Sequence, residues 1–186
     1  MRVGGRAVGP RGAAVAALLA ALVLGACGGG DARYAAGGVS FAYPKSWHTV
    51  VPATSGPGAT GGGTTSRVGL GIDAQDLAIL VTNRLPAPVT AESFGKTEDS
   101  LAASLAQGAR QKGATVQGPT PTSVGGMQGF SLTISNLPLG GTTVTSRLVV
   151  VLQGDTEYFL NCQATAAHAD EIGSGCDRVL ATFGSS

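Results

Sequence analysis

The chain has 186 residues, of which 30 are glycine and 12% are charged, and its formal net charge is +1. Three of its twelve basic residues precede residue 12, so the rest of the chain holds nine basic and eleven acidic residues, a net charge of −2. The sequence shows no basic stripe, and we therefore expect no nucleic-acid partner. The length suits one folded domain behind an N-terminal leader.

The N-terminal leader has the features of a signal peptide. Three arginines precede an unbroken apolar run over residues 13–24, which is shorter than the roughly 20 residues that span a bilayer. Leu-Gly-Ala-Cys at residues 24–27 resembles the lipobox of bacterial lipoproteins. We therefore expect residues 1–26 to be a signal peptide and Cys27 to carry the lipid, palmitate included, that anchors the chain at the extracytoplasmic face of the cell membrane.

Two alternatives to lipidation exist for this leader. An ordinary secretory cleavage after Ala26 would leave Cys27 as a plain residue, and an uncleaved segment would form an N-terminal membrane helix. The lipobox spacing favours lipidation over both. Glycines at 28–30 follow, so residues 27–38 are interpreted as a flexible tether and residues 39–186 as the folded domain. The Ala, Gly and Arg bias indicates a GC-rich genome, such as that of an actinobacterium.

The first part of the domain predicts four strands. Apolar residues alternate over 39–43, and 47–51, 66–72 and 77–82 follow as further strands. The Gly-rich stretch over 52–65 is predicted to be a loop, whose part 55–65 is either a lid over a pocket or a surface insertion.

A helix, four strands and a second helix are predicted next. Residues 91–112 carry an apolar stripe at helical spacing, with Thr90 as the N-cap. Strands over 115–117, 128–136, 142–153 and 156–165 form a meander, and a helix over 167–183 ends the chain. Because strands and helices do not alternate regularly, we expect an α+β fold with a central antiparallel sheet.

With Cys27 assigned to lipid, Cys162 and Cys176 remain. Two cysteines in an oxidising compartment most often form a disulfide. Two buried thiols, or a metal site with His168, are the alternatives. A disulfide would join the last helix to the sheet, because Cys176 lies on the apolar face of that helix.

Residues 39–47, Val-Ser-Phe-Ala-Tyr-Pro-Lys-Ser-Trp, resemble the opening motif of PsbP-like domains. The resemblance continues through a central amphipathic helix, a β-meander and a terminal helix, and covers most of residues 39–183. The combination with a lipobox and a late cysteine pair is similar to actinobacterial lipoproteins of the LpqN/LpqT type. It implies an α/β/α sandwich around an antiparallel sheet and a binding or assembly role, and it implies no shared catalytic residue. The sequence shows no metal-binding or cofactor motif, so no metal is expected.

Few residues of this sequence could carry chemistry. His48 and His168 are the only histidines, and both are interpreted as surface residues rather than metal ligands or general bases. Residues 69–74, Gly-Leu-Gly-Ile-Asp-Ala, imitate a dinucleotide fingerprint but lie inside a strand pattern, which excludes that reading. Tyr43 and Trp47 are either ligand-stacking rings or core residues, and core packing is favoured.

These observations favour a non-catalytic, membrane-anchored binding module that takes an envelope protein or an apolar or lipid ligand. An envelope hydrolase with an unrecognised site around His48 or His168 is one alternative. A structural or assembly lipoprotein is the other. We expect no enzyme activity and no cofactor.

Overall fold

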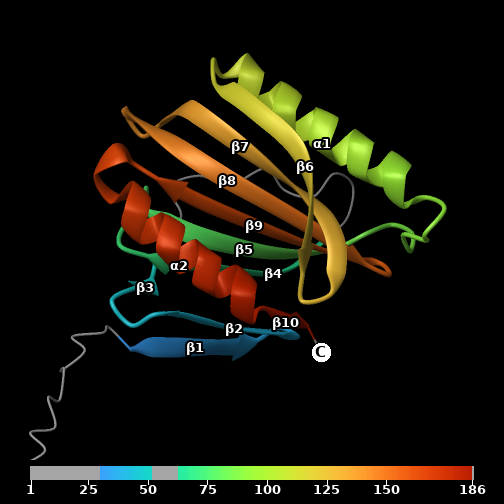
Figure 1. The fold of residues 1–186 in the computed structure, drawn as a ribbon, viewed down its shortest axis with the longest axis horizontal. Helices are drawn as coiled ribbons and strands as arrows, with labels where there is room; N and C mark the ends of the chain where they lie inside the picture. The colour runs from blue at the N-terminus through green and yellow to red at the C-terminus, as the bar shows by residue number, and fades with distance from the viewer. Residues whose placement is uncertain (1–29, 52–62, 186) are drawn as a thin grey trace, which may run out of the picture.

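The computed structural model describes residues 30–51 and 63–185 (Figure 1). It contains two sheets and two α-helices. The elements are β1 (Asp31–Ala36), β2 (Val39–Pro44), β3 (His48–Thr49), β4 (Gly63–Gly71), β5 (Leu77–Arg84), α1 (Phe94–Gln111), β6 (Thr115–Val124), β7 (Met127–Leu139), β8 (Thr142–Gln153), β9 (Thr156–Ala164), a 3₁₀ turn (Ala166–His168), α2 (Ala169–Thr182) and β10 (Gly184–Ser185).

Seven strands form the central sheet in the order β3-β4-β5-β9-β8-β7-β6, and every neighbouring pair is antiparallel. Helix α1 packs on β6 and β7 from one face. Helix α2 packs on β5 and β9 from the other face and also contacts β2 of the small sheet β1-β2-β10 (Figure 1). The expected α/β/α arrangement around an antiparallel sheet is thereby confirmed.

Strand β5 shows why the sheet needs a layer on each face. Its first seven residues are all buried. Leu77, Ile79 and Val81 belong to the apolar cluster on the α1 side, whereas Ala78 and Leu80 belong to the cluster on the α2 side. This alternation follows from the two-residue period of a strand. A continuous apolar run is therefore stable only between two covering layers.

Residues 31–36 correct the expected tether, because they form strand β1 rather than a flexible linker. β1 pairs antiparallel with β2 along its whole length, from Asp31 opposite Pro44 to Ala36 opposite Val39. Asp31 also forms an ion pair with Arg178 of α2. The remaining tether residues 27–29 and the loop over 52–62 lie outside the described residues.

Several element boundaries differ from expectation, most clearly those of β6 and α1. Strand β6 extends to Val124, past Pro119 and Pro121, because it is the edge of the sheet and an edge strand tolerates residues without a backbone N–H. Helix α1 begins at Phe94 rather than at residue 91. Before it, Thr90 and Ser93 exchange hydrogen bonds, with the backbone N–H of each donating to the hydroxyl oxygen of the other (2.9 and 3.2 Å).

Trp47 is a core residue, as predicted. Its side chain is 4% exposed and belongs to the cluster under α2. The ring lies against the backbone of α2 at Gly175, where the missing side chain makes room for it. Tyr43 packs at the margin of the same cluster, and its ring meets Phe41 edge-on with the centroids 6.4 Å apart. Neither ring is presented to solvent as a stacking platform.

Candidate functional site

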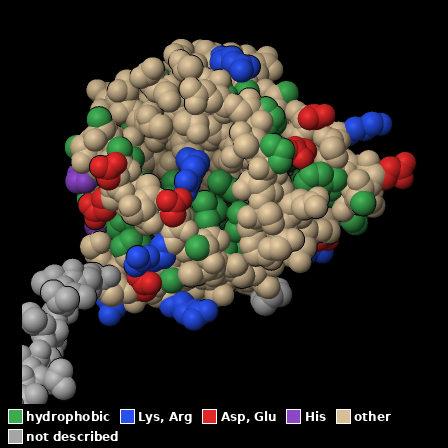
Figure 2. All heavy atoms as spheres, in the orientation of Figure 1, with side chains coloured by type: hydrophobic (Ala, Val, Ile, Leu, Met, Phe, Trp, Pro, Cys, Tyr) green, Lys and Arg blue, Asp and Glu red, His purple; other side chains and the backbone are tan. Residues whose placement is uncertain are grey.

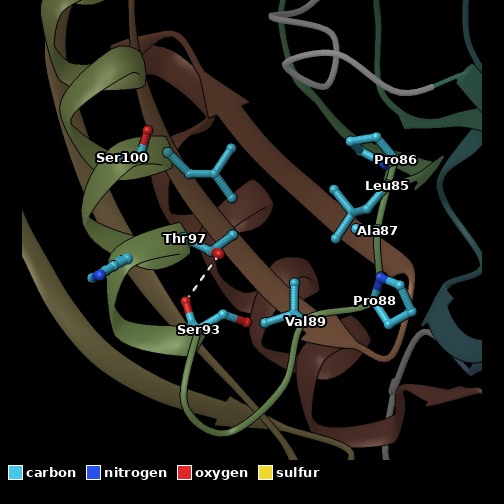
Figure 3. A pocket seen from close by; sticks show the side chains of 10 residues that line it. Leu85, Pro86, Ala87, Pro88, Val89, Ser93, Thr97 and Ser100 are labelled. Carbon is cyan, nitrogen blue, oxygen red and sulfur yellow. Dashed lines mark hydrogen bonds between the residues drawn. The ribbon is translucent and has the colours of Figure 1, made fainter.

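A cleft of about 420 Å³, here called cleft A, lies between α1 and the chain segment that precedes this helix. One wall is residues 85–89, and the other is formed by Ser93, which directly precedes α1, and by Lys96, Thr97 and Ser100 of α1 (Figure 3). Its volume falls in the range of about 300–1,000 Å³ typical of small-molecule sites. The cleft is open to solvent, so it is not the enclosed cavity that a completely buried ligand would need.

The lining of cleft A combines apolar and polar groups. Leu85 and Leu101 are buried in the cluster on the α1 side and form an apolar base, with Val89 beside them. Hydroxyl groups come from α1, where the Thr97 hydroxyl donates to the Ser93 carbonyl oxygen at 3.0 Å. This arrangement can take an apolar group whose polar end stays near the helix.

A second cleft, cleft B, has a volume of about 340 Å³ and lies on the other side of the same segment. It is lined by residues 89–91 and Phe94, by residues 126–128 at the β6–β7 turn, and by Leu152 and Gln153 of β8. Val89 lines both clefts. The segment 85–93, here called the connector, therefore separates the two clefts.

The connector is held mainly at its first half. The backbone N–H groups of Leu85 and Val89 donate to the carbonyl oxygens of Asp155 and Gly154, each at 2.7 Å. The Arg84 guanidinium also lies 2.8 Å from the Asp155 carboxylate, but the Arg84 side chain is largely exposed and that of Asp155 is half-buried, and ion pairs near the surface contribute little. The β8–β9 turn thus holds the first half of the connector in place through these two hydrogen bonds.

Beneath this turn lies a buried acid, Glu157 of β9, which is 2% exposed. The Asn83 amide donates to its Oε1 at 3.3 Å, whereas no described group hydrogen-bonds to its Oε2. Burial raises the pKa of Glu157, and the hydrogen bond from Asn83 acts in the opposite direction more weakly. Sequence reasoning missed this residue, although an acid inside a strand of mostly apolar residues was a visible signal.

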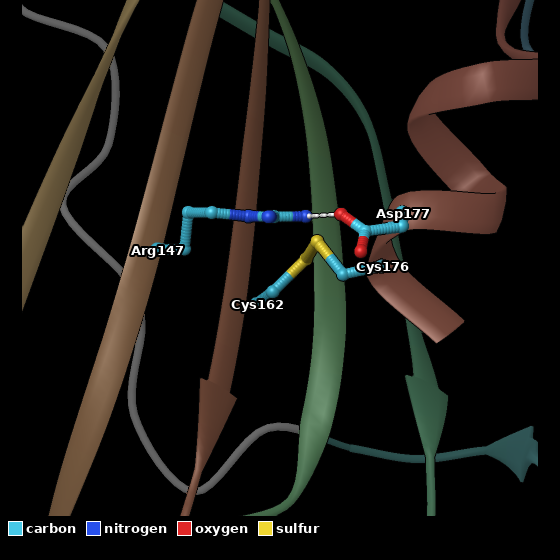
Figure 4. Close-up of a disulfide and its surroundings, with 4 residues drawn as sticks. All are labelled: Arg147, Cys162, Cys176 and Asp177. Atoms are coloured by element: carbon cyan, nitrogen blue, oxygen red, sulfur yellow. Dashed lines mark hydrogen bonds and ion pairs between the residues drawn. A yellow bond between two sulfur atoms is a disulfide. The ribbon is translucent and has the colours of Figure 1, made fainter. Parts of the chain in front are cut away.

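The disulfide predicted between Cys162 and Cys176 is present and joins β9 to α2 (Figure 4). Its Cα atoms are 6.1 Å apart, within the usual range. Beside it, the Arg147 guanidinium contacts the Asp177 carboxylate at 2.7 Å. The disulfide is structural, because Cys176 is completely buried. Cys27, the predicted lipidation site, lies outside the described residues.

His48 is exposed and His168 is partly exposed. His48 is in the short edge strand β3, and His168 is at the start of α2, with Nδ1 3.8 Å from Glu171. Both lie near Asp73, whose pKa is lowered by backbone hydrogen bonds from Gln75 and Asp76 and, more weakly, by the two histidines. Neither histidine lines cleft A or B.

Within residues 30–51 and 63–185, no three His, Cys, Asp or Glu side chains are arranged to hold a metal ion. The same residues contain no helix that combines the length and apolar character of a membrane span. On the face in Figure 2, charged side chains are scattered, with no continuous basic area. The predictions of no metal, no cofactor and no nucleic-acid partner stay predictions.

Comparison with solved structures defines the fold class. The chain is similar to the solution structure of cyanobacterial PsbP (CyanoP) from Synechocystis, with 15% identity, a TM-score of 0.56, and coverage of 88% of this chain and 99% of that one. The fold is therefore PsbP-like. No protein-family model matches the sequence, and no curated protein matches it.

A looser likeness exists to LpqN of Mycobacterium tuberculosis, described as involved in cell envelope biogenesis. Its identity is 14%, its TM-score is 0.44, and the match covers 83% of this chain and 89% of that one. PA94 of Pseudomonas aeruginosa, described as a putative regulator, matches with 12% identity and a TM-score of 0.42 over 81% and 95% of the two chains. At these scores we base no inference on either likeness.

Proposed function

We propose that this protein is a lipoprotein anchored through Cys27 outside the cell membrane, and that its PsbP-like domain binds an apolar or lipid ligand without catalysis. The observation that supports the proposal best is cleft A, which places an apolar base of Leu85 and Leu101 beside a row of helix hydroxyls. An actinobacterial lipoprotein of the LpqN/LpqT type is the finer assignment that the sequence motifs favour.

The geometry of cleft A suits an amphiphile better than a fully apolar molecule. An apolar chain can cover the leucine side chains, and each methylene that leaves water contributes about 0.8 kcal/mol. Because the cleft is open, the polar end of such a ligand keeps its contact with water or with Ser93 and Ser100. A site of this kind needs no acid, base or nucleophile.

The anchor is tested separately from the cleft. The full chain and its Cys27→Ser variant are expressed in a bacterium that processes lipoproteins, and the membrane fraction is examined by mass spectrometry. We expect the mature N-terminus to be an acylated Cys27 in the parent chain and the variant to lose its membrane association. A parent chain that is cleaved but unacylated would contradict lipidation.

The cleft is tested by filling it. Ala87→Trp puts an indole into the wall of cleft A, whereas Ala103→Trp puts the same group on an exposed position of α1 outside the cleft. We expect lipid extracted with the full chain from its native membrane to be lost in Ala87→Trp and kept in Ala103→Trp. Equal lipid content in both variants would refute cleft A as the site. Loss of a co-purifying protein instead of a lipid would favour an assembly role.

A further inference from the structure

The charged residues beside the start of the described chain are mostly basic. Arg33 of β1 and Lys45, which follows β2, are exposed, and neither has an ion-pair partner among the described residues. Arg178 of α2 pairs with Asp31 of β1. These four residues, here called the basic margin, carry a net charge of +2, whereas the other charged residues after the leader, six basic and ten acidic, sum to −4. Figure 2 shows Lys and Arg side chains along the lower edge of this face, where Figure 1 places β1 and β2.

Strand pairing places Arg33 on the outer face of the small sheet. Tyr34, the next residue, stacks its ring on that of Phe41 with the centroids 5.0 Å apart, and both rings pack in the apolar cluster on the α2 side. Because neighbouring side chains of a strand point to opposite faces, Arg33 points away from this cluster. Its cross-strand neighbour is Ala42, whose short side chain lets a flat surface approach the guanidinium group.

Lys45 lies where the chain enters the domain. Its backbone N–H donates to the Gly30 carbonyl oxygen at 3.1 Å, and its ammonium group lies against Gly30, where a Cβ would be 2.9 Å from Nζ. Gly30 follows Cys27 by three residues, which span at most about 11 Å. A lipid on Cys27 would therefore hold the Lys45 ammonium group close to the headgroups of the bilayer.

We propose that the basic margin is a contact surface for the anionic phospholipid headgroups of the membrane that carries the protein. The inference rests on the proposed anchor at Cys27, and it adds which residues meet the bilayer and which lipid they prefer. Near an anionic surface each Lys or Arg strengthens binding about fivefold. Two such charges bind weakly from solution, but the anchor gives them a high effective concentration of headgroups.

The acids of α2 do not cancel this charge. Asp177, next to Arg178 in the chain, pairs with Arg147 of β8. Asp170 and Glu171 are in the first turn of α2, about 10 Å or more along the helix from Arg178 at 1.5 Å per residue. That distance exceeds the Debye length of about 8 Å at physiological ionic strength.

A protein partner fits the basic margin less well than a lipid surface. The span of at most about 11 Å between Cys27 and Gly30 equals the diameter of one helix with its side chains, so a folded protein has no room between the margin and the bilayer. A second copy of this chain, docked through the same face, would bring like charges together.

The test uses residues 27–186, which contain every helix and strand of the described structure. With Cys162 and Cys176 in the disulfide, Cys27 is the single free thiol, and it is coupled to a maleimide-bearing phospholipid in nanodiscs. This coupling does not depend on acylation in a cell, so the contact surface and the proposed anchor can fail separately. The nanodiscs contain phosphatidylcholine, with or without phosphatidylglycerol, and a trace of nitroxide-labelled lipid. Paramagnetic broadening of amide NMR signals then measures the approach of each residue to the bilayer.

We expect phosphatidylglycerol to increase the broadening at Ala35 and Ser40 of the small sheet, but not at Ala103 of α1. Salt at about 1 M, where the Debye length falls to about 3 Å, should remove the increase. Arg33→Gln and Lys45→Gln should each lower the ratio of docked to undocked protein about fivefold, and the double variant should lower it about 25-fold.

The matched control is the double variant Arg110→Gln and Lys112→Gln. It also removes one Arg and one Lys, from exposed positions at the end of α1, and it should leave the ratio unchanged. All four replaced side chains are exposed, so the remaining amide signals should superimpose on those of the parent and show that each variant is folded.

Three results would overturn the inference. Equal broadening of β1 with and without phosphatidylglycerol would show that charge does not hold the margin at the bilayer. An equal loss of contact in the α1 control would assign the effect to net charge rather than to this surface. Chemical-shift changes in β1 that depend on the number of protein copies per nanodisc, and not on phosphatidylglycerol, would identify a second copy of the chain as the occupant.

Discussion

Gly175 in α2 gives the sharpest prediction for the stability of this fold. The Trp47 ring lies directly against the helix backbone at this position. A Cβ at residue 175 would be 2.5 Å from Cη2 and 3.0 Å from Cε2 of Trp47, and closer still to Cζ2. Carbon atoms pack at about 3.5–4.0 Å, so the indole would have to move by about 1 Å or more. Because Trp47 is 4% exposed, its neighbours have little room to accept that movement.

Gly175→Ala therefore combines two opposing effects. Alanine is favoured over glycine inside a helix by about 1 kcal/mol, whereas overpacking of a tight core costs about 1–3 kcal/mol. The contact with a rigid, buried ring places this site at the upper end of that range, so we expect a net destabilisation of about 1–2 kcal/mol. Gly173 is in the same helix, and a Cβ there meets nothing within 4 Å. Gly173→Ala should show the helix effect alone and stabilise by about 0.5–1 kcal/mol.

Urea unfolding of the two variants and the parent, with the disulfide intact, measures both changes. Trp47 is the only tryptophan of the chain, so its fluorescence reports on the contact itself. At about 2–4 °C per kcal/mol for a domain of this size, the melting temperatures should move in opposite directions. Equal stabilisation by both alanines would refute the close contact between Trp47 and α2.

Three further predictions concern buried groups. The raised pKa of Glu157 means that the folded state binds its proton more tightly than the unfolded state, so stability should fall as pH rises from the ordinary glutamate pKa through the raised one. Glu157→Gln should remove this fall and be more stable than the parent at neutral pH. Urea midpoints that depend on pH in the same way in the variant and the parent would contradict this prediction. Replacing both Cys162 and Cys176 by alanine opens a loop with a sequence separation of 14 and should cost about 3 kcal/mol, measured as a lower urea midpoint that equals that of the reduced parent. Asp76 accepts hydrogen bonds from the backbone N–H and hydroxyl of Thr165 at 2.6 and 3.0 Å, so Asp76→Ala should cost about 1–3 kcal/mol and accelerate amide exchange at Thr165.

The layered fold could be predicted because its signals are local. The alternation of apolar residues in 39–43, the continuous run over 148–152 and the helical stripe through Leu101 and Ala109 each depend on neighbours within a few positions. The disulfide could also be predicted, because Cys176 falls on the apolar face of the last helix and the expected export places both cysteines in an oxidising compartment. The structure has a strand or a helix at each of these places, as the spacing of the apolar residues predicts.

The tether and the site depend on contacts that sequence spacing does not reveal. Residues 31–36 carry no strong apolar alternation, and they form a strand because β2 offers a free edge and Arg178 lies opposite Asp31. Cleft A needs the connector to be pinned on the β8–β9 turn, a contact across about 70 residues of sequence. Glu157 could have been noticed, but its burial is known only once β5 and β8 are placed beside it.

The two faces of the central sheet carry different features. The α2 face holds the disulfide, the Trp47 contact and an apolar cluster that includes the small sheet. The α1 side holds cleft A, cleft B and the buried carboxyl group of Glu157. Because cleft A is the proposed binding site, replacements that strengthen the α2 side should leave ligand binding unchanged, whereas replacements that fill cleft A should weaken it.

The position of β1 indicates which side of the domain should lie nearer the membrane. Because β1 begins at Asp31, only residues 27–30 separate its start from the lipid proposed on Cys27, and four residues reach at most about 14 Å. The small sheet, which packs with α2 on the face opposite α1 (Figure 1), should then lie near the membrane, with cleft A on the far side. A fluorophore attached to Ala32→Cys should therefore be quenched by brominated lipid in vesicles that carry the anchored protein, and one on Ala87→Cys should not. Equal quenching at both positions would place the cleft at the membrane surface and favour a ligand taken directly from the anchoring bilayer, whereas the expected difference favours a ligand that reaches the domain from the opposite side.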